Sequence, residues 1–314
     1  MLITMSFANL KSFFGRRAAK LKLQILSDLH LEVGQQYAEW SSTLTFPVAA
    51  PFLILGGDIG RLIDYDGYLT FLSAQAARYD KVFLVLGNHE FYGLDHASGL
   101  AKARQLCNEP SLGGKVVLMD RIRWDDKATD VTLLGCTLWS SIPGHASGVV
   151  QSKVSDFKKI NGWTTERHNE VHTKEFCWLQ NQVAEINNAP GVRKRTIVVL
   201  THHAPCLEGS SRPEHAANPW ASAFATDLIA SDLSAARKQW PNVKAWVFGH
   251  THYTTDTVRS GIRIVANQRG YVLPGGQRAK EKEEQTSMAK QSIFSLSQRT
   301  ENSHHFRLDK VLSL

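Results

Sequence analysis

Five apolar runs in this sequence each end in side chains that could bind a metal ion. The side chains are Asp28 and His30 after "LKLQIL", Asp58 after "PFLILGG", Asn88 and His89 after "KVFLVLG", His202 and His203 after "RTIVVLT", and His250 and His252 after "VKAWVFG". A single histidine at the end of a strand is more often a hydrogen-bonded structural residue than a ligand. Carboxylates and imidazoles buried together are costly without cations, however, so the joint pattern indicates a metal site.

The spacing and chemistry of these residues favour two ions over one. In D-x-H and H-x-H, residues two apart on an extended chain project to the same side, so both can reach one ion. The set has carboxylates, imidazoles and an amide but no thiolate, which favours Mn²⁺, Fe²⁺ or Zn²⁺ over a cysteine-bound structural zinc. The candidates are too many for one tetrahedral ion and suit two divalent ions that share a bridging ligand. Nearby glycines, at positions 56, 57, 60, 87 and 249, allow sharp turns and close approach.

Strands alternate with helices along the chain, which indicates an α/β fold. Apolar runs predict strands at 21–26, 51–57, 81–87, 115–119, 131–139, 195–205 and 243–252, and a hairpin at 255–267 with its turn at Ser260 and Gly261. Helical periodicity predicts helices at 66–79, 95–107, 166–187 and 224–238, whereas 120–130, 140–165 and 206–222 read as turns or loops. Ligands in such folds gather outside the carboxyl ends of the strands, so we expect the five strand ends to meet in one cleft.

One domain with a sizeable core accounts for most of the 314 residues, which are 43% hydrophobic and 21% charged. We place this domain at residues 21–274, after an N-terminal extension at 1–20 in which a short amphipathic helix could form. Residues 275–314 are polar, and we expect them to form a surface helix or a disordered tail.

The charge, the cysteine spacing and the hydropathy of the chain limit the classes of binding partner and the cellular compartment that we expect. The formal net charge of +7 would help to attract phosphorylated or nucleic-acid substrates, although no Lys/Arg-rich block stands out as a nucleic-acid-binding arm. The four cysteines lie far apart without a C-x-x-C pair, which argues against a disulfide framework and for reduced thiols in the cytoplasm. No run is long enough to span a membrane, so no membrane insertion is expected, and the N-terminus lacks the apolar core of a signal peptide.

Taken in order, "SDLHLE", "GGDIG", "GNHEFY", "THHAP" and "GHTH" resemble the calcineurin-like metallophosphoesterase superfamily. The motifs run from residue 27 to residue 252, and "RIVANQRGY" extends the resemblance to residue 271. Each motif alone is a weak signal, but the five in this order are highly specific. The resemblance implies a four-layer α/β/β/α sandwich with a dimetal site at the carboxyl ends of the strands.

The resemblance also implies a role for each motif residue. The first ion is expected on Asp28, His30, Asp58 and His252, and the second on Asp58, Asn88, His202 and His250, so that Asp58 bridges the two. Two cations roughly 3.5–4 Å apart can bridge a water, lower its pKa and clamp the phosphoryl oxygens, and the bridging hydroxide would attack phosphorus. His89 is implied as the acid that protonates the leaving group. For Glu90 we expect a hydrogen bond to a ligand imidazole rather than contact with substrate.

Several further residues have weaker signals. Arg61, His203 and Arg269 are candidate substrate contacts, although an exposed Arg61 and a core position for His203 are the alternatives. In "RHNEVH", His168 and His172 lie four apart, but Asn169 stands where a zinc protease needs glutamate, so that function is rejected. A solvent-facing pair, or one histidine lining the substrate cleft, remains as the alternative. Gln268 stands where related sequences often have proline, which affects the expected shape of that loop.

We therefore predict a metal-dependent hydrolase of phosphate mono- or diesters that acts on a phosphorylated small molecule or nucleotide. A nuclease is less favoured because the chain has no long insertion for binding DNA. A binding scaffold that kept the fold and lost its chemistry is the alternative from another class, and it would be expected to lack a ligand or the acid. The sequence does not choose between monoester and diester, nor between Mn, Fe and Zn.

Overall fold

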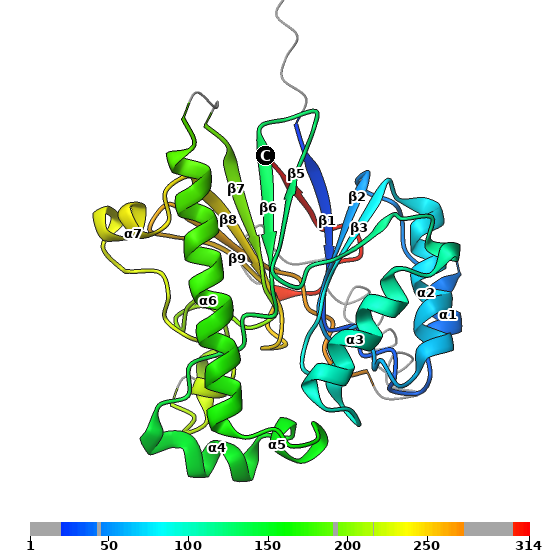
Figure 1. Ribbon diagram of the computed structural model, residues 1–314, viewed down its shortest axis with the longest axis horizontal. Coiled ribbons are helices and arrows are strands. Elements are labelled where there is room, and N and C mark those ends of the chain that lie inside the picture. The colour runs from blue at the N-terminus through cyan, green and yellow to red at the C-terminus, as the bar shows by residue number, and fades with distance from the viewer. Residues whose placement is uncertain (1–19, 43–44, 191–193, 216, 273–303) are drawn as a thin grey trace, which may run out of the picture.

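The computed structural model describes residues 20–42, 45–190, 194–215, 217–272 and 304–314. In this part of the chain two β-sheets pack face to face, and helices cover their outer faces (Figure 1). Helices α1 (Tyr37–Ser41), α2 (Tyr65–Arg78) and α3 (His96–Cys107) cover one sheet, and α6 (Thr165–Asn188) and α7 (Leu233–Gln239) cover the other. The predicted four-layer α/β/β/α sandwich is confirmed.

The first sheet has the strand order β11-β1-β2-β3-β4. The parallel strands are β1 (Lys22–Leu26), β2 (Phe52–Gly56), β3 (Lys81–Val85) and β4 (Val116–Leu118). At the edge, β11 (Val311–Ser313) pairs antiparallel with β1 and buries Leu312 opposite Leu23. These last residues differ from the predicted helical or disordered tail, because so short a strand is specified by its distant partner and not by a local pattern. Residues 273–303 of that tail, and residues 1–19 of the predicted extension, lie outside the described residues.

The second sheet has the strand order β5-β6-β7-β8-β10-β9. Its strands are β5 (Ile122–Asp125), β6 (Val131–Gly135), β7 (Thr196–Leu200), β8 (Val243–Phe248), β9 (Thr255–Arg259) and β10 (Ile262–Ala266). The predicted hairpin is confirmed, and Ser260 and Gly261 have the φ values of 48° and 81° that suit a tight hairpin turn. The prediction of a plain turn at 120–130 is wrong, because β5 pairs antiparallel with β6 there. This edge strand has mostly exposed side chains, so it lacks an apolar run.

Alternation along the strands builds the layers of the core. On β7, Val198 and Leu200 face the other sheet, whereas Ile197 and Val199 pack toward α6 and α7. This period of two requires both faces of each central strand to be apolar, which explains the continuous apolar runs of the sequence. Among the described residues, no helix combines the length and hydropathy needed to cross a membrane.

One predicted helix and one predicted loop need correction. The helix predicted at 224–238 begins only at Leu233, because the side chain of Asp232 accepts a hydrogen bond from the Ala235 amide and caps it. The segment read as a loop at 140–165 contains α4 (Ser147–Lys153) and α5 (Asp156–Lys159). In Figure 1 both short helices lie beyond the lower end of the sheets, the end at which β7 stops and the site begins.

Candidate metal centre

The carboxyl ends of five strands meet at one place between the two sheets. The first sheet supplies Asp28 and His30 after β1, Asp58 after β2 and Asn88 after β3, and the second supplies His202 after β7 and His250 and His252 after β8. All of these side chains are buried except that of His252, which is partly exposed. The cleft predicted from the strand ends is therefore present in the structure.

The backbone at this place is strained. Five of the seven residues have left-handed φ values, which are 52° for Asp28, 48° for His30, 52° for Asp58, 72° for His250 and 51° for His252. Such conformations cost roughly 1–3 kcal/mol each for residues other than glycine and cluster at functional sites. Here they turn each side chain sharply away from its strand and toward the common centre.

Two glycines are required because nothing larger fits beside the ligands. A Cβ atom on Gly87 would overlap Asp58 Oδ1. A Cβ atom on Gly249 would overlap Ser27 Oγ and would come within 2.7 Å of Asp28 Oδ2. Two of the five glycine positions noted in the sequence, Gly87 and Gly249, are therefore explained by close packing against the carboxylates.

Four side chains form a first cluster, Asp28, His30, Asp58 and His252, whose ligand atoms all lie within 4.8 Å of one another. His30 Nε2 lies 2.9 Å from His252 Nε2 and 3.9 Å from Asp58 Oδ2. His252 Nε2 lies 3.5 Å from Asp28 Oδ1. These are the four residues that the resemblance assigns to the first ion.

A second cluster shares Asp58 with the first and adds His202 and His250, again within 4.8 Å. His202 Nε2 lies 3.4 Å from Asp58 Oδ1 and 3.1 Å from Asn88 Oδ1, so the amide oxygen belongs to the same group. Asp58 thus faces the first cluster with Oδ2 and the second with Oδ1. A carboxylate placed in this way can bridge two ions.

The donor atoms of both clusters fit divalent cations. In the described part of the chain, His250 Nε2 is buried and has no hydrogen-bond partner, which is rare for a buried polar atom. His202 Nδ1 lies 2.9 Å from the Gly56 carbonyl oxygen, to which it can donate, so its Nε2 lone pair would face two oxygens. Burial alone would lower the pKa of His202, but the charge of Asp58 raises it to about 10, and burial raises the pKa of Asp28 to about 6. At neutral pH a proton would therefore occupy His202, at the position where a cation is expected.

Glu90 holds the loops that carry the ligands. Its carboxylate accepts hydrogen bonds from the amides of Asp58 at 3.0 Å, Ile59 at 2.9 Å and Gly87 at 2.7 Å, and from the Tyr68 hydroxyl at 2.9 Å. The expected bond to a ligand imidazole is not found, because backbone amides of two loops take up both oxygens. Burial, together with the charge of Asp58, raises the pKa of Glu90 to about 7.

Asp156 orients the amide ligand and was not among the residues predicted from the sequence. Its Oδ1 accepts hydrogen bonds from Asn88 Nδ2 and from the Tyr92 hydroxyl, both at 2.7 Å. Since the Nδ2 group is held on this side, the Oδ1 atom of Asn88 faces the second cluster. Asp156 lies in α5, a segment that the sequence analysis read as loop, and no local signal marks it.

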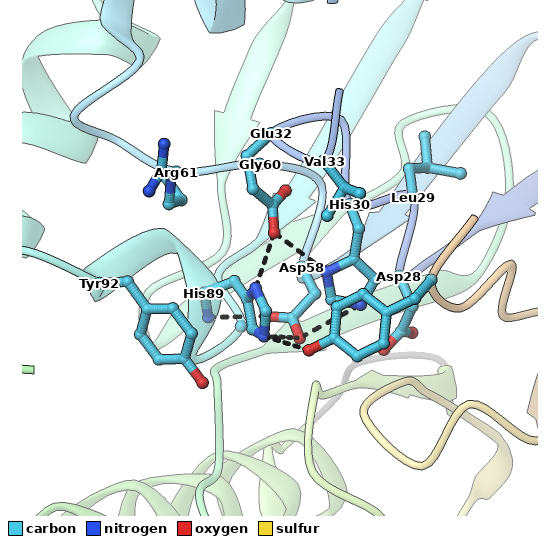
Figure 2. Close-up of polar contacts among 12 residues, drawn as sticks. Asp28, Leu29, His30, Glu32, Val33, Asp58, Gly60, Arg61, His89 and Tyr92 are labelled. Carbon is cyan, nitrogen blue, oxygen red and sulfur yellow. Dashed lines mark hydrogen bonds and ion pairs between the residues drawn. The ribbon is translucent and has the colours of Figure 1, made fainter. Parts of the chain in front are cut away.

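His89 lies between the metal centre and the solvent. Figure 2 shows its ring beside Asp58, with Nδ1 2.7 Å from Glu32 Oε1. Its Nε2 lies 2.8 Å from the Tyr271 hydroxyl and 3.9 Å from Asp58 Oδ2. Burial would lower the pKa of His89, but the charges of Asp58 and Glu32 raise it, which favours the imidazolium.

Glu32 was another residue missed from the sequence, although a signal was present. It follows His30 by two positions and lies 3.2 Å from His30 Nδ1, so one carboxylate contacts both imidazoles. The spacing of two residues in D-x-H continues to this third position, although the chain turns here and is not an extended strand.

Two of the predicted substrate contacts, His203 and Arg269, have other partners in the structure. His203 is fully buried and packs against the His250 ring at 4.1 Å, which agrees with the core alternative. Arg269 lies over the Trp40 ring and donates to the Leu29 carbonyl oxygen at 2.9 Å, so its guanidinium is engaged elsewhere. Arg61 forms an ion pair with Asp64 at 3.1 Å and is set apart from the Asp58 group in Figure 2.

The histidine pair of α6 is structural. His168 is fully buried, and its Nε2 accepts from the Ser140 amide at 3.1 Å. His172 is also buried, with Nδ1 3.0 Å from the Leu138 carbonyl oxygen. Neither ring of this pair faces solvent or lines the cleft, because both connect α6 to the segment after β6.

Two cavities open beside the metal centre. The larger, of about 1200 Å³, reaches Asp58, Asn88 and His250 and extends along Leu207, Trp220 and Phe224. The smaller, of about 680 Å³, is lined by Glu32, Arg61, Lys158 and Lys159 among others. His89, Tyr92 and Tyr271 line both cavities and lie where they meet.

Comparison with known proteins agrees with this architecture. Residues 21–254 match the family described as calcineurin-like phosphoesterase. An uncharacterized protein of Acanthamoeba polyphaga mimivirus is 28% identical over 270 residues, which cover 79% of this chain and 91% of that protein.

Solved structures share the fold at low sequence identity. Phosphopantetheinyl hydrolase from Mycobacterium tuberculosis superposes with a TM-score of 0.58 and 18% identity, over 84% of this chain and 94% of that one. A dimetal phosphatase from Danio rerio gives a TM-score of 0.44 and 13% identity, over 79% of this chain and 87% of that one. The first likeness shows the fold alone, and the second is too weak to carry an argument.

Proposed function

The chain belongs to the calcineurin-like phosphoesterase family, and on that premise we propose that it hydrolyses phosphate esters with two divalent metal ions bound. The observation that carries the proposal is Asp58, whose two oxygens face two separate clusters of buried ligands. Asp28, His30 and His252 would hold one ion with Asp58, and Asn88, His202 and His250 would hold the other with Asp58. When bound, such a pair of ions lowers the pKa of a water and polarises phosphoryl oxygens.

The residues of the chain supply positioning and the proton. His89 would donate a proton from Nε2 to the departing oxygen, and Glu32 on Nδ1 keeps the ring in the protonated form and in this orientation. The Tyr271 hydroxyl, 2.8 Å from Nε2, occupies the position that a leaving-group oxygen would take. Glu90 and Asp156 hold the loops and the amide, so that little rearrangement is needed during reaction.

A catalytically silent scaffold would be expected to lack a ligand or the acid. Every side chain of the two clusters, and His89 as well, is present and buried or partly buried here. Two cavities next to the centre also provide room for an organic group on the substrate.

The test is hydrolysis of p-nitrophenyl phosphate and bis(p-nitrophenyl) phosphate by protein loaded with Mn²⁺. Asp58→Asn should lower kcat/KM by at least about 10³-fold, since it removes the only ligand common to both clusters. His89→Ala should lower it by about 10²-fold or more. Asp66→Asn and His145→Ala, at exposed positions outside both cavities, serve as matched controls. Metal-replete protein that hydrolyses neither ester would count against the proposal.

A further inference from the structure

The smaller cavity carries positive charge immediately beyond the proposed proton donor. Lys158 and Lys159 extend into it from the end of α5, and Arg61 lines it from the loop after β2. The Lys159 ammonium lies 4.8 Å from the centre of the Tyr92 ring, and that ring lies 4.3 Å from the His89 ring. The Tyr92 ring thus contacts both the Lys159 ammonium and the His89 imidazole, which would face the leaving group.

Acidic groups nearby do not cancel this charge. Glu32 also lines the cavity, but its Oε1 lies 2.7 Å from His89 Nδ1 and 3.2 Å from His30 Nδ1, so this carboxylate is engaged by the two rings and not by the lysines. Arg61 is neutralised by Asp64. The two lysines remain, and neither forms an ion pair among the described residues.

Both lysines retain donors for a ligand. Lys158 Nζ donates one hydrogen bond to the Ser152 carbonyl oxygen at 2.8 Å, which leaves two of its three protons free. Lys159 makes its contact to Tyr92 through the ring face and thus keeps its donors. Two adjacent ammonium groups with free donors match a phosphoryl anion.

We infer that the groove of Arg61, Lys158 and Lys159 binds a second phosphoryl group that is attached to the leaving alcohol of the substrate. The inference rests on the proposed function, because it places the leaving group beside His89. In the reaction the P–O bond to the alcohol breaks and a bond from phosphorus to the water oxygen forms. His89 gives a proton to the departing oxygen, which becomes the alcohol, and the proton that the water loses restores the imidazolium. The second phosphate stays in the groove while the P–O bond breaks and is released with the alcohol. Preferred substrates are accordingly bisphosphorylated compounds.

The test compares propyl phosphate with 1,3-propanediol bisphosphate, which differ only in the second phosphate. Wild-type protein loaded with Mn²⁺ should show a kcat/KM for the bisphosphate that is on the order of 10–100-fold higher, beyond the small statistical advantage of two equivalent phosphates. The advantage should appear mainly in KM, since the second phosphate does not change charge during the reaction. It should also decrease at high salt.

The variant that tests the groove is Lys158→Ala with Lys159→Ala. It should lose most of the preference and leave propyl phosphate hydrolysis within about twofold of wild type. The Gly93 amide bonds to the backbone oxygen of Lys159, so truncation of the side chain leaves that contact in place. Lys174→Ala with Lys238→Ala removes the same charge at exposed positions outside both cavities and should keep the preference.

The outcomes separate the two hypotheses. Wild-type protein that hydrolyses both compounds with equal efficiency, or a groove variant that keeps the full preference, overturns the inference alone. Metal-replete protein inert toward these compounds and toward nitrophenyl esters overturns the proposed function and the inference with it.

Discussion

Replacing Asp156 with alanine removes the carboxylate that holds the amide of Asn88. Asn88 Nδ2 and the Tyr92 hydroxyl both donate to Asp156 Oδ1 at 2.7 Å, and both donors are buried. Without this acceptor, the Tyr92 hydroxyl at 3.0 Å is the remaining partner of Asn88 Nδ2, so the amide is held less firmly and can rotate to present Nδ2 instead of Oδ1 to the second cluster. An NH₂ group cannot act as a ligand, so the second ion should lose one of its four protein ligands for much of the time.

The magnitude follows from the role of such supporting contacts. Loss of a hydrogen-bond partner behind a metal ligand typically costs 10–100-fold in affinity, which is about 1.4–2.7 kcal/mol. The first cluster contains neither Asn88 nor Asp156, so its ion should be affected by less than about threefold. Activity should fall in parallel with occupancy of the second position and should recover at high Mn²⁺.

The assay is isothermal titration of Mn²⁺ into metal-free protein, which resolves the two binding steps. Tyr92→Phe is the matched control, because it removes the hydroxyl that donates to Asp156 and accepts from Asn88 Nδ2 at 3.0 Å, but leaves the shorter bond from Asn88 Nδ2 to Asp156 Oδ1 intact. We expect that control to stay within about threefold of wild type at both steps. Equal weakening of both ions by Asp156→Ala, or no weakening in a protein with an unchanged melting temperature, would refute the reasoning.

Three further predictions concern other parts of the structure. Glu32→Gln should lower kcat/KM about 10–100-fold for alkyl phosphates, because Glu32 supports the proton donor His89. The loss should be less than about threefold for nitrophenyl phosphate, whose leaving group needs no proton. Equal losses on both substrates would contradict this role of Glu32. Gly249→Ala should destabilise the fold by more than about 2 kcal/mol and weaken metal binding, because the added Cβ meets Asp28 Oδ2 at 2.7 Å; Gly148→Ala, with open space around it, is the control in chemical denaturation. Burial, with the charge of Asp120, raises the pKa of Glu175 from 4.5 to about 8, so its protonated form is favoured in the folded state. The free energy of unfolding should therefore fall as pH rises from about 4.5 to about 8, by at most about 5 kcal/mol, and Glu175→Gln should flatten this dependence in denaturation curves of metal-free protein.

The positions of the strands and of the ligands could be predicted because both depend on local pattern. Each central strand is buried on two faces, so it leaves a continuous apolar run, and the polar residues that end the run mark the edge of the sheet. Asp28 and His30 could be placed together because both directly follow the same strand, although the backbone there turns through left-handed φ values instead of staying extended. The turn at Ser260 and Gly261 was readable for the same reason, since its conformation is set by its own residues.

The parts that could not be predicted depend on distant partners. Asp156 acts on Asn88 from 68 positions away, and nothing near it in the sequence differs from an ordinary polar segment. β11 is recognisable only beside β1, from which it is separated by nearly the whole chain. A hydrogen-bonding role was predicted for Glu90, but its partners were not. They are backbone amides at two sharp turns, and no residue type in the sequence marks an amide that needs an acceptor.

Each proposed ion takes ligands from both sheets, and this has a mechanical consequence. The first sheet contributes Asp28, His30, Asp58 and Asn88. The second sheet contributes His202, His250 and His252. Bound ions would add cross-links between two layers that are joined at this end by side-chain packing and by hydrogen bonds, such as the one from the His250 amide to Asp28 Oδ1 at 2.9 Å. The affinity for metal and the free energy of packing between the two sheets are then thermodynamically linked. Val198→Ala, for example, changes the layer between the sheets and none of the ligands. It should lower the affinity for both ions, and excess metal should restore the stability that was lost.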